Sequence, residues 1–499
     1  MQIALPERIL LAVLFLLPAV VVAQLEHQAY LKSFNDSEIE RGRAVAVSGD
    51  IIALSGLAGE QSDLGNVVIY ERRDGEEWLP VNVLKAFNAE SDDDFGKAIA
   101  LDSDTIVVGA PGEDSDATGI DGDGINNDQP DSGAVYVYVR TPEGKWNQQA
   151  YIKPSNTGKD DLFGSSVSLE GDTLVVGAPG ESSDASGVGG NPGDDSLQSA
   201  GAAYVFVRQE GQWMQQAYLK ASVPDAFDLF GNAVVVHRNW IMVGAPFERS
   251  AGTGVTGNPG DNSLVGAGAV YGFVRQGVNW SLFSYIKASN TDSLDRFGSA
   301  LDMTSRPTSF GPEFLLAVGA PGEASNAIDV GGNQDDNSQE DAGAVYLILG
   351  NGVGGWGQVG YLKASNTGAD DEFGRQVAVT GGSTQRIVVG ALFEDSIGSG
   401  VDGVQNDNSA SNAGAAYTFL RQNQDIVPVN YLKASNTDEG DRFGFSVAAD
   451  RSLIVVGAIL EASDAIGANG NQSNNDAPLA GAAYVLGFPD QLFSDRFSD

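Results

Sequence analysis

Short runs of alternating apolar and polar residues recur along this 499-residue chain, and turns rich in Gly, Asn and Asp separate them. In one representative stretch the runs predict four strands, at 166–169, 173–176, 202–208 and 215–221. A tight turn at 170–172 joins the first two strands, a long connection joins the next two, and a short hairpin joins the last two. No stretch shows the 3.6-residue periodicity of an amphipathic helix. The pattern therefore predicts units of four antiparallel strands.

The four-strand unit is repeated along the chain. A Phe-Gly pair opens each copy, and successive pairs are 68, 67, 67, 76 and 70 residues apart. The six pairs are Phe95-Gly96, Phe163-Gly164, Phe230-Gly231, Phe297-Gly298, Phe373-Gly374 and Phe443-Gly444. Each is followed by Gly-Ala-Pro or a close variant, which begins at Gly109, Gly177, Gly244, Gly319, Gly390 and Gly457. Four strands in a repeat of this length are typical of a β-propeller blade.

A seventh copy, which departs from the pattern, stands first. Gly42 matches the glycine of the Phe-Gly pair, Arg41 replaces the phenylalanine, and 55–57 replaces Gly-Ala-Pro. The chain begins with an isolated outer-strand signal at 27–33, and its last repeat stops after the third strand at Leu486. Pairing these two pieces would remove an exposed sheet edge. We therefore predict an all-β fold: a single seven-bladed β-propeller with four antiparallel strands per blade, closed by the N-terminal strand.

The repeated Phe-Gly and Gly-Ala-Pro segments resemble the FG-GAP repeat, as in the propeller head of integrin α subunits. The resemblance covers about residues 27–488 and is greatest to the secreted bacterial branch of that family. It implies an extracellular module for binding or adhesion. Integrin-type repeats hold calcium in an Asp-x-Asp-x-Asp-Gly loop between the first two strands of a blade. Here that connection is a short turn such as 170–172, so those calcium ligands cannot be carried over.

The charge of the chain limits the classes of partner that it can bind. It has 67 Asp and Glu but 28 Lys and Arg, for a formal net charge of −39. Such a composition excludes nucleic acid as a partner, because neutralising phosphates needs basic patches, and it disfavours an electrostatic hold on anionic lipid. The absence of Cys excludes disulfides and thiol chemistry. Only His27 and His237 could supply imidazole, so neither a His-rich metal site nor a His-based triad is expected.

The two ends of the chain lie outside the repeat. Arg8 precedes a 15-residue apolar run at 9–23, too short to span a bilayer, which predicts a signal peptide over 1–23 with cleavage before Gln24. The propeller is then expected over 24–488, followed by a tail at 489–499. We expect a secreted, extracellular or cell-surface protein, a monomer with no transmembrane segment in the mature chain.

Several side chains recur in every regular repeat, which favours structural roles. Each Phe of the Phe-Gly pair is interpreted as an apolar plug between blades, and five of the six Trp as braces of the outer hairpin. A Glu lies two residues after each Gly-Ala-x, and an Asp lies two residues before each Phe. They are Glu113, Glu181, Glu248, Glu323, Glu394 and Glu461, with Asp93, Asp161, Asp228, Asp295, Asp371 and Asp441. Because an active site is normally built once per ring, we interpret these carboxylates as turn caps rather than acid/base pairs.

His237 and Trp240 break the repeat. They lie in the turn of one first-strand hairpin and form an asymmetric aromatic and basic cluster. A catalytic or ligand-binding role is one interpretation, and an idiosyncratic hairpin is the favoured one.

The long connections between second and third strands carry the strongest chemical signal. Each combines Asp, Asn and Ser with Gly. The Asp, Asn and Ser side chains supply hard oxygen ligands and the Gly residues supply a flexible loop, and Ca²⁺ requires both. The candidate metal ligands are Asp121, Asp123, Asp128, Asp194, Asp195, Asp261, Asp335, Asp336 and Asp407. One of them recurs at a single repeat position, occupied by Asp128, Asp194, Asp261, Asp336 and Asp407, with Asn474 in the last copy. The same residues also form ordinary solvated loops, so both interpretations stay open.

These patterns favour a non-catalytic binding or adhesion module that recognises an extracellular protein or glycan through its acidic loops, with Ca²⁺ as a candidate cofactor. We expect no enzyme activity. The alternatives are a carbohydrate-active enzyme built on a propeller, which needs symmetry-breaking residues near the axis, and a structural envelope or matrix protein.

Overall fold

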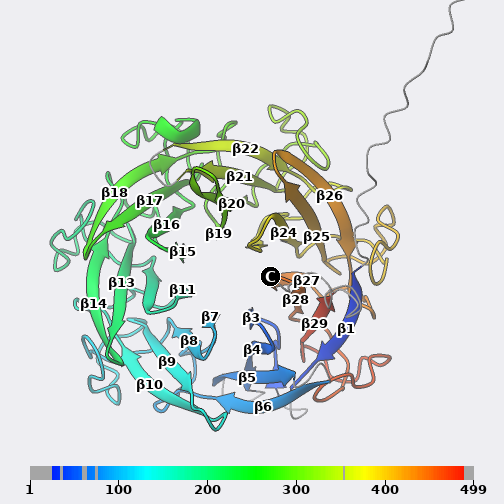
Figure 1. Ribbon diagram of the computed structural model, residues 1–499, viewed down its shortest axis with the longest axis horizontal. Coiled ribbons are helices and arrows are strands. Elements are labelled where there is room, and N and C mark those ends of the chain that lie inside the picture. Colours follow the sequence, from blue (N-terminus) through cyan, green and yellow to red (C-terminus); the bar gives the residue numbers. More distant parts are fainter. Residues whose placement is uncertain (1–24, 34–37, 59–63, 73–76, 352–354, 488–499) are drawn as a thin grey trace, which may run out of the picture.

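The computed structural model describes residues 25–33, 38–58, 64–72, 77–351 and 355–487. These residues form a closed ring of seven antiparallel sheets, the blades, around a central axis (Figure 1). In each blade the first strand lies next to the axis and the fourth lies at the outer edge. The predicted seven-bladed propeller is confirmed.

The blades are numbered along the chain. Blade 1 comprises β3 (Val45–Ser48), β4 (Ile51–Ala58), β5 (Gly65–Arg72) and β6 (Trp78–Leu84), with β2 (Glu38–Ile39) paired to β4. Blade 2 comprises β7 (Ala98–Asp102), β8 (Thr105–Ala110), β9 (Ala134–Arg140) and β10 (Trp146–Ile152). Blade 3 comprises β11 (Ser166–Glu170), β12 (Thr173–Ala178), β13 (Ala202–Gln209) and β14 (Gln212–Leu219). Blade 4 comprises β15 (Ala233–His237), β16 (Trp240–Ala245), β17 (Ala269–Gln276) and β18 (Asn279–Ile286).

The remaining blades complete the ring. Blade 5 comprises β19 (Ala300–Thr308), β20 (Gly311–Ala320), β21 (Ala344–Gly350) and β22 (Trp356–Leu362). Blade 6 comprises β23 (Gln376–Val379), β24 (Thr384–Ala391), β25 (Ala415–Gln422) and β26 (Asp425–Leu432). Blade 7 comprises β27 (Phe443–Asp450), β28 (Leu453–Ala458), β29 (Ala482–Gly487) and β1 (Glu26–Leu31).

The N-terminal strand closes the ring. β1 pairs antiparallel with β29, and Tyr30 lies opposite Tyr484. The outermost strand of blade 7 therefore comes from the start of the chain, as predicted, and every blade has its fourth strand.

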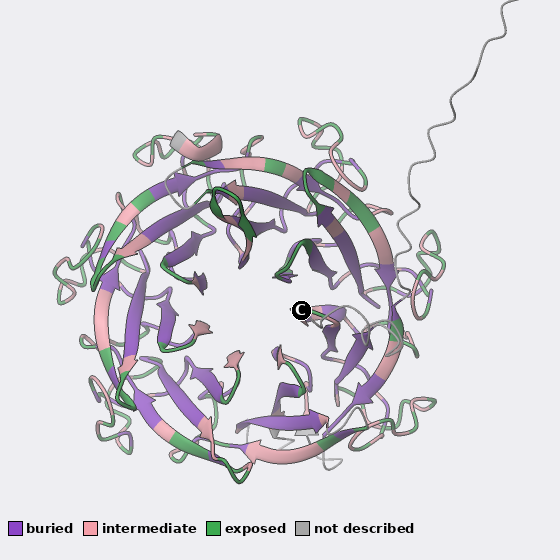
Figure 2. Cartoon of the chain, viewed as in Figure 1, coloured by how far each residue is buried: buried purple, intermediate pink, exposed green. Residues whose placement is uncertain are grey.

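Burial follows the position of a strand within its blade (Figure 2). All six residues of β12 are buried, because a neighbouring blade covers each face of the sheet, and its sequence is accordingly a continuous apolar run. The outermost strand β14 mixes exposed and buried residues. β14 begins at Gln212, three residues before the predicted start, so Trp213 lies inside the strand rather than in the turn. The indole Nε1 of Trp213 donates a hydrogen bond to Gln149 Oε1 of blade 2, 2.9 Å away.

The Phe-Gly pairs lie at the seams between blades. Phe163 is fully buried between blades 2 and 3, with its ring 5.4 Å from that of Tyr204. Gly164 follows with φ +96, and a Cβ on Gly109 of blade 2 would lie 2.0 Å from the Gly164 carbonyl oxygen. Only glycine permits this approach of two backbones. The predicted plug role of the phenylalanines is confirmed.

The first copy uses the same seam with different residues. Gly42 N donates to Ser55 O at 2.9 Å, as Gly96 N donates to Gly109 O at 2.9 Å, so the proposed alignment of this copy is correct. Arg41 occupies the place of the phenylalanine and is fully buried, with Nη2 2.9 Å from Asn66 Oδ1. A hydrogen-bonded guanidinium therefore replaces an apolar plug.

Helices contribute little to the described part of the chain. It contains one short 3₁₀ turn, η1 (Gly254–Thr256), and none of its helices is long and apolar enough to cross a membrane. The predicted signal peptide, 1–23, and the tail, 489–499, lie outside the described residues.

Candidate binding surface

Six long loops project from the outer edge of the ring (Figure 1). They connect the second and third strands of blades 2 to 7 and are each 23 residues long, and we call them the rim loops. They are 111–133, 179–201, 246–268, 321–343, 392–414 and 459–481. Each is tied to the outer strand of its own blade; for example, Ile120 forms a bridge with Ile152 and Val188 with Leu219. The rim loops therefore lie over the outer part of the blades rather than over the axis.

The rim loops concentrate the negative charge of the protein. Together they hold 26 of the 67 Asp and Glu residues and only one of the 28 Lys and Arg residues, Arg249. Most of their residues are exposed or partly exposed, in contrast to the strands beneath (Figure 2). One face of the ring thus carries a strong negative potential at its rim, which attracts cations and cationic partners.

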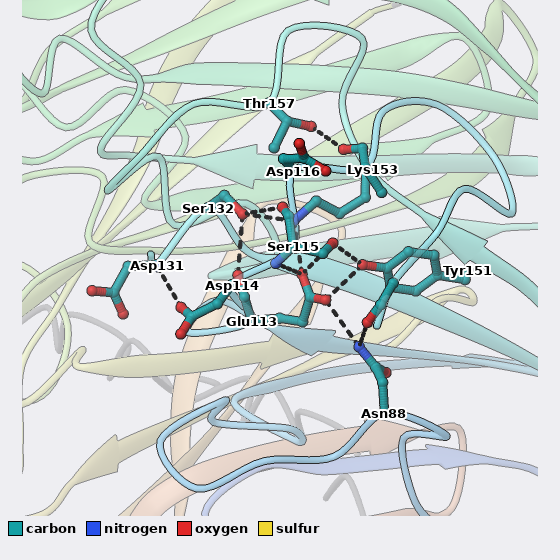
Figure 3. A network of polar contacts seen from close by, with 12 residues as sticks. Asn88, Glu113, Asp114, Ser115, Asp116, Asp131, Ser132, Tyr151, Lys153 and Thr157 are labelled. Atoms are coloured by element: carbon teal, nitrogen blue, oxygen red, sulfur yellow. Dashed lines mark hydrogen bonds and ion pairs between the residues drawn. The ribbon is translucent and has the colours of Figure 1, made fainter. Parts of the chain in front are cut away.

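A buried polar network anchors the base of each rim loop, shown for blade 2 in Figure 3. Glu113 Oε2 lies 2.7 Å from Lys153 Nζ, and Tyr151 donates to Glu113 Oε1 at 2.7 Å. Ser115 and Tyr151 share a hydrogen bond of 2.6 Å. Glu113 and Lys153 are both at most 2 % exposed, and burial lowers the pKa of the lysine while the glutamate opposes that effect. Both charged groups therefore have bonding partners, which a buried ion pair requires.

The same pair recurs in six blades. The salt bridges join Lys153 to Glu113, Lys220 to Glu181, Lys287 to Glu248, Lys363 to Glu323, Lys433 to Glu394 and Lys32 to Glu461, at 2.6–2.9 Å. The glutamates were expected to cap turns, and Glu113 does accept the amide of Ser115 at 3.2 Å. Their main partner is nevertheless the lysine of the outermost strand. These carboxylates therefore hold the blade to its rim loop and are not exposed for acid/base chemistry.

An asparagine extends the network to the loop backbone. Asn88 Nδ2 donates to Glu113 Oε1 and to Gly124 O, and Asn88 Oδ1 accepts from Tyr136 at 2.6 Å. The equivalents in four further blades are Asn156, Asn290, Asn366 and Asn436. Blade 4 lacks this link, because Val223 stands in that place. The hydroxyl of Tyr271 consequently has no hydrogen-bond partner among the described residues.

The aspartates before each Phe cap turns, as predicted. Asp161 Oδ2 accepts the amide of Gly158 at 2.8 Å, and Asp228 Oδ2 accepts that of Asp225 at 3.0 Å. Burial raises the pKa of both carboxyls to about 7, and the nearby glutamate of the network adds to the effect. Four others behave alike: Asp93, Asp295, Asp371 and Asp441.

The predicted metal ligands are distributed along the rim loops. Several already accept hydrogen bonds from backbone amides: Asp121 from Tyr151 N of strand β10 at 2.9 Å, Asp123 from Ile125 N at 3.2 Å and Asp336 from Ser338 N at 2.9 Å. Asp194 and Asp261 accept similar bonds from the residue two positions on. Within the described part of the chain, the carboxylates of Asp128, Asp195, Asp335 and Asp407 accept no hydrogen bond. The described residues contain no group of three or more His, Asp or Glu side chains arranged to hold a metal ion.

One predicted repeat position needs correction. Asn474 Oδ1 accepts the amide of Asp464, and Asn126 Oδ1 accepts that of Asp116, in both cases ten residues back. The amide of Asp184 is likewise ten residues before its acceptor, Asp194. Asn126, and not Asp128, is therefore the equivalent of Asp194. Since asparagine serves in two blades, this position requires an acceptor for loop amides rather than a charge.

His237 connects three blades near the axis, on the face opposite the rim loops. Its Nε2 lies 2.8 Å from Ser305 Oγ of blade 5, and its Nδ1 lies 3.0 Å from Glu170 Oε1 of blade 3. Other blades are latched at the same level: Asp102 accepts the amide of Gly171 at 2.6 Å, and Asp450 accepts that of Gly49 at 2.6 Å. His237 thus continues a series of inter-blade latches.

Trp240 is buried between blades 4 and 5. Its ring lies 5.3 Å from that of Trp356 and 6.1 Å from that of Phe314, in both cases measured between centroids. This environment is one of apolar packing, which agrees with the favoured interpretation of the hairpin.

The axis carries polar residues that sequence reasoning missed. All seven blades line a hollow of about 260 Å³ on the axis, where the first strands begin near the Phe-Gly turns. Arg43 and Lys97 line it, and Arg43 forms a two-pronged salt bridge with Asp94 at 2.8 and 3.0 Å. Arg43 and Lys97 each directly follow the glycine of their repeat, where blades 3 to 5 have Ser or Asn. An alignment of this position across the repeats would have revealed the two basic residues.

Comparison with known proteins identifies the FG-GAP repeat at residues 78–138, 146–206, 356–419 and 428–486. None of the curated protein sequences matches the chain. Among solved structures, an ulvan lyase of polysaccharide lyase family PL25, bound to -[GlcA(1-4)Rha3S]-, is 10% identical with a TM-score of 0.40, over 93% of this chain and 95% of that one.

A hypothetical selenium-binding protein from Sulfolobus tokodaii is also 10% identical, with a TM-score of 0.32, over 63% of this chain. That match spans 64% of the selenium-binding protein, less than two thirds of its length. The matched repeats, together with the Phe-Gly and Gly-Ala-Pro seams of a seven-bladed ring, show that the chain belongs to the FG-GAP repeat family.

Proposed function

We propose that this protein is a secreted, non-catalytic binding or adhesion module whose rim loops recognise an extracellular protein or glycan. The observation that carries the proposal is that buried polar residues of the repeats anchor the rim loops, while the rim loops themselves are largely exposed. The buried Glu, Lys and Tyr side chains, joined by an Asn in every rim-loop blade except blade 4, hold the base of each rim loop against its blade. A rigid scaffold that displays variable polar loops is the usual architecture of a recognition surface.

The charge of the rim loops defines the preferred partner. With 26 acidic residues and a single basic one, these loops favour a cationic protein surface, or a glycan held through a bridging cation. Calcium remains part of the proposal as a prediction. Because the candidate carboxylates are dispersed or engaged with loop amides, binding the ion would require the loops to rearrange.

One arrangement favours an enzyme instead. Ser305, His237 and Glu170 follow the order of nucleophile, base and orienting acid, with both hydrogen bonds at suitable lengths. The second candidate function is therefore a hydrolase that uses Ser305. Against it stands the series of inter-blade latches to which His237 belongs.

Screening the purified protein on arrays of extracellular proteins and glycans, with and without calcium, tests the proposal. Asp195→Asn and Asp335→Asn remove exposed rim-loop charges whose carboxylates make no hydrogen bond in their loops, and each should weaken binding of a partner found this way. Glu143→Gln, on an exposed turn of the opposite face, is the matched control and should have no effect. Equal binding by all three variants would overturn the role of the rim loops.

A further inference from the structure

A groove between blades 3 and 4 begins on the face opposite the rim loops. A hollow of about 600 Å³ is lined by the turns after β11 and β15 and by the ends of β13 and β17. A second hollow of about 440 Å³ continues it along β14 and β18 as far as Val188 and Gly189 of the rim loop of blade 3, and the two hollows share Gln216 and Val278. Together they form one open groove, which we call the turn-face groove.

Three arginines line this groove, and Arg238 and Arg275 have surroundings that differ from those of the equivalent positions in blades 1 to 3. In blades 1 to 3 the arginine at the end of the third strand is paired with an aspartate of the first turn. The pairs are Arg72 with Asp50 at 3.1 Å, Arg140 with Asp104 at 3.7 Å and Arg208 with Asp172 at 2.7 Å. In blade 4 the aspartate is replaced by Asn239, whose Oδ1 lies 3.3 Å from Arg275 Nε. No carboxylate of the described residues lies within 4.0 Å of Arg275 nitrogen atoms. Its Nη1 donates to Thr173 Oγ1 at 3.1 Å and its Nη2 to the Arg238 carbonyl oxygen at 3.3 Å, and the guanidinium lies over the Trp280 ring. Its partners among these residues are therefore all uncharged.

The neighbouring turn residue adds a second unpaired cation. Arg238 is exposed, and no salt bridge or side-chain hydrogen bond joins it to the described residues. It has φ +56, in the left-handed region, where the equivalent turns of blades 1 and 3 have Gly49 and Gly171. An arginine in this conformation is strained by about 1 kcal/mol relative to glycine. Arg451 of blade 7 is also exposed with positive φ, so the strain alone does not mark a binding site.

The carboxylates in the groove do not cancel these charges. Asp172 is bound by Arg208, and Glu170 accepts from His237 and from the amide of Arg238. The groove therefore holds three arginines against two carboxylates. The corresponding seam between blades 2 and 3 has two arginines, Arg140 and Arg208, against three aspartates, Asp102, Asp104 and Asp172. The excess of positive charge is specific to this seam in that comparison.

The remaining lining is rich in amides. Gln209, Gln216 and Asn239 line the first hollow, and Gln215 and Asn279 line the second. Primary amides both donate and accept hydrogen bonds, as the hydroxyl groups of sugars do. Guanidinium groups bind carboxylate and sulfate groups in two-pronged fashion. An open groove with cations at one end and amides along its length fits a polymer that carries both hydroxyls and acidic groups.

We propose that the turn-face groove binds an acidic polysaccharide, with Arg238 and Arg275 holding its carboxylate or sulfate groups. The net charge of −39 does not prevent this, because the three arginines lie at the end of the blades opposite the rim loops. Strands of five to eight residues separate the two faces by about 20 Å, and charges are screened over about 8 Å at physiological ionic strength. The site goes beyond the function proposed for the rim loops and is independent of it.

Affinity measurements at about 150 mM salt test this site, with chondroitin sulfate and polygalacturonate as ligands, dextran as the neutral control and inorganic sulfate as the free anion. Arg238→Gly restores the residue of blade 3, and Asn239→Asp restores the neutralising carboxylate. Each should weaken binding of the acidic polymers about tenfold. Arg451→Gly is the matched control, because Arg451 also has positive φ in a first turn, but in blade 7. It should leave the affinity unchanged.

Neither substitution should unfold the protein, because both residues occur natively at the equivalent position of blade 3. Equal affinity of the wild type and Arg238→Gly for the acidic polymers would overturn the proposal. So would equal binding of dextran, no binding of either acidic polymer, or binding of inorganic sulfate alone. The rim-loop variants Asp195→Asn and Asp335→Asn should not affect this binding, which separates the two proposals.

Discussion

Lys32 and Glu461 lie 429 positions apart in the chain and form a buried salt bridge 2.6 Å long. Lys32 follows the N-terminal strand β1, whereas Glu461 lies near the start of the rim loop of blade 7. The closure of the ring therefore consists of more than strand pairing. The same ion pair that anchors five other rim loops here joins the two ends of the fold.

Loss of this lysine should destabilise the whole ring. Lys32→Ala leaves Glu461 buried without its partner, which lowers the free energy of unfolding by about 3–5 kcal/mol. Lys85 occupies the same repeat position in blade 1 but is exposed. Lys85→Ala should change stability by less than about 0.5 kcal/mol. Denaturant titration of both variants measures the difference, and equal effects would show that the closing ion pair is dispensable.

Restoring the missing asparagine of blade 4 should stabilise the protein. Val223→Asn would give the buried hydroxyl of Tyr271 a partner and reach the backbone of the rim loop 246–268. The expected gain is about 1 kcal/mol. The reverse change in blade 3, Asn156→Val, removes the bond from Tyr204 to Asn156 and should destabilise by about 1–3 kcal/mol. A loss of stability on Val223→Asn would mean that the network differs in blade 4.

Stability should fall as the pH rises from about 4 to about 7. Burial raises the pKa of Asp228 to about 7 from an ordinary value of 3.8, so the folded state binds the proton more tightly than the unfolded state. The stabilisation is complete below the lower value and is lost through the upper one. Five equivalent aspartates add to the effect.

Asp228→Asn isolates one of these groups. Its Oδ1 has no partner among the described residues, whereas Oδ2 accepts an amide that asparagine can also satisfy. The variant should melt above the wild type at pH 8 and close to it at pH 5. A difference in melting temperature that does not depend on pH would contradict the assignment.

Calcium should raise the melting temperature more than magnesium at equal ionic strength. Extracellular calcium modules bind at about 0.1–1 mM, so about 10 mM calcium would add roughly 1–3 kcal/mol per occupied site. Asp261→Asn keeps the loop hydrogen bond, as the native Asn126 and Asn474 do, and removes one charge. It should reduce the calcium-specific shift. Equal shifts with both ions would identify the rim loops as an acidic surface without calcium sites.

Sequence reasoning predicted the parts of this fold that follow from the phase of the repeat. The plug of Phe163, the turn at Gly164 and the pairing of β1 with β29 all depend on which strand each signal represents, and that order is visible in the chain. The start of β14 was predicted less well, because Trp213 lies in a strand whose exposed residues resemble those of a turn.

Contacts between distant residues were not predictable in the same way. Glu113 and Lys153 both recur with the repeat, but their salt bridge depends on the path of the intervening rim loop. Ser305 and Glu170 meet His237 only because three blades are in register at the axis. The replacement of a Gly-Asp turn by Arg238-Asn239 is visible in the sequence, yet its meaning depends on the position of Arg275.

Incubating the purified protein with the partner found by array screening, and analysing both for new products by mass spectrometry, distinguishes a binding module from an enzyme. We expect saturable binding and an unchanged partner, for the wild type and for Ser305→Ala alike. Conversion of the partner into product by the wild type, abolished by Ser305→Ala while binding persists, would show an enzyme and contradict the proposed function.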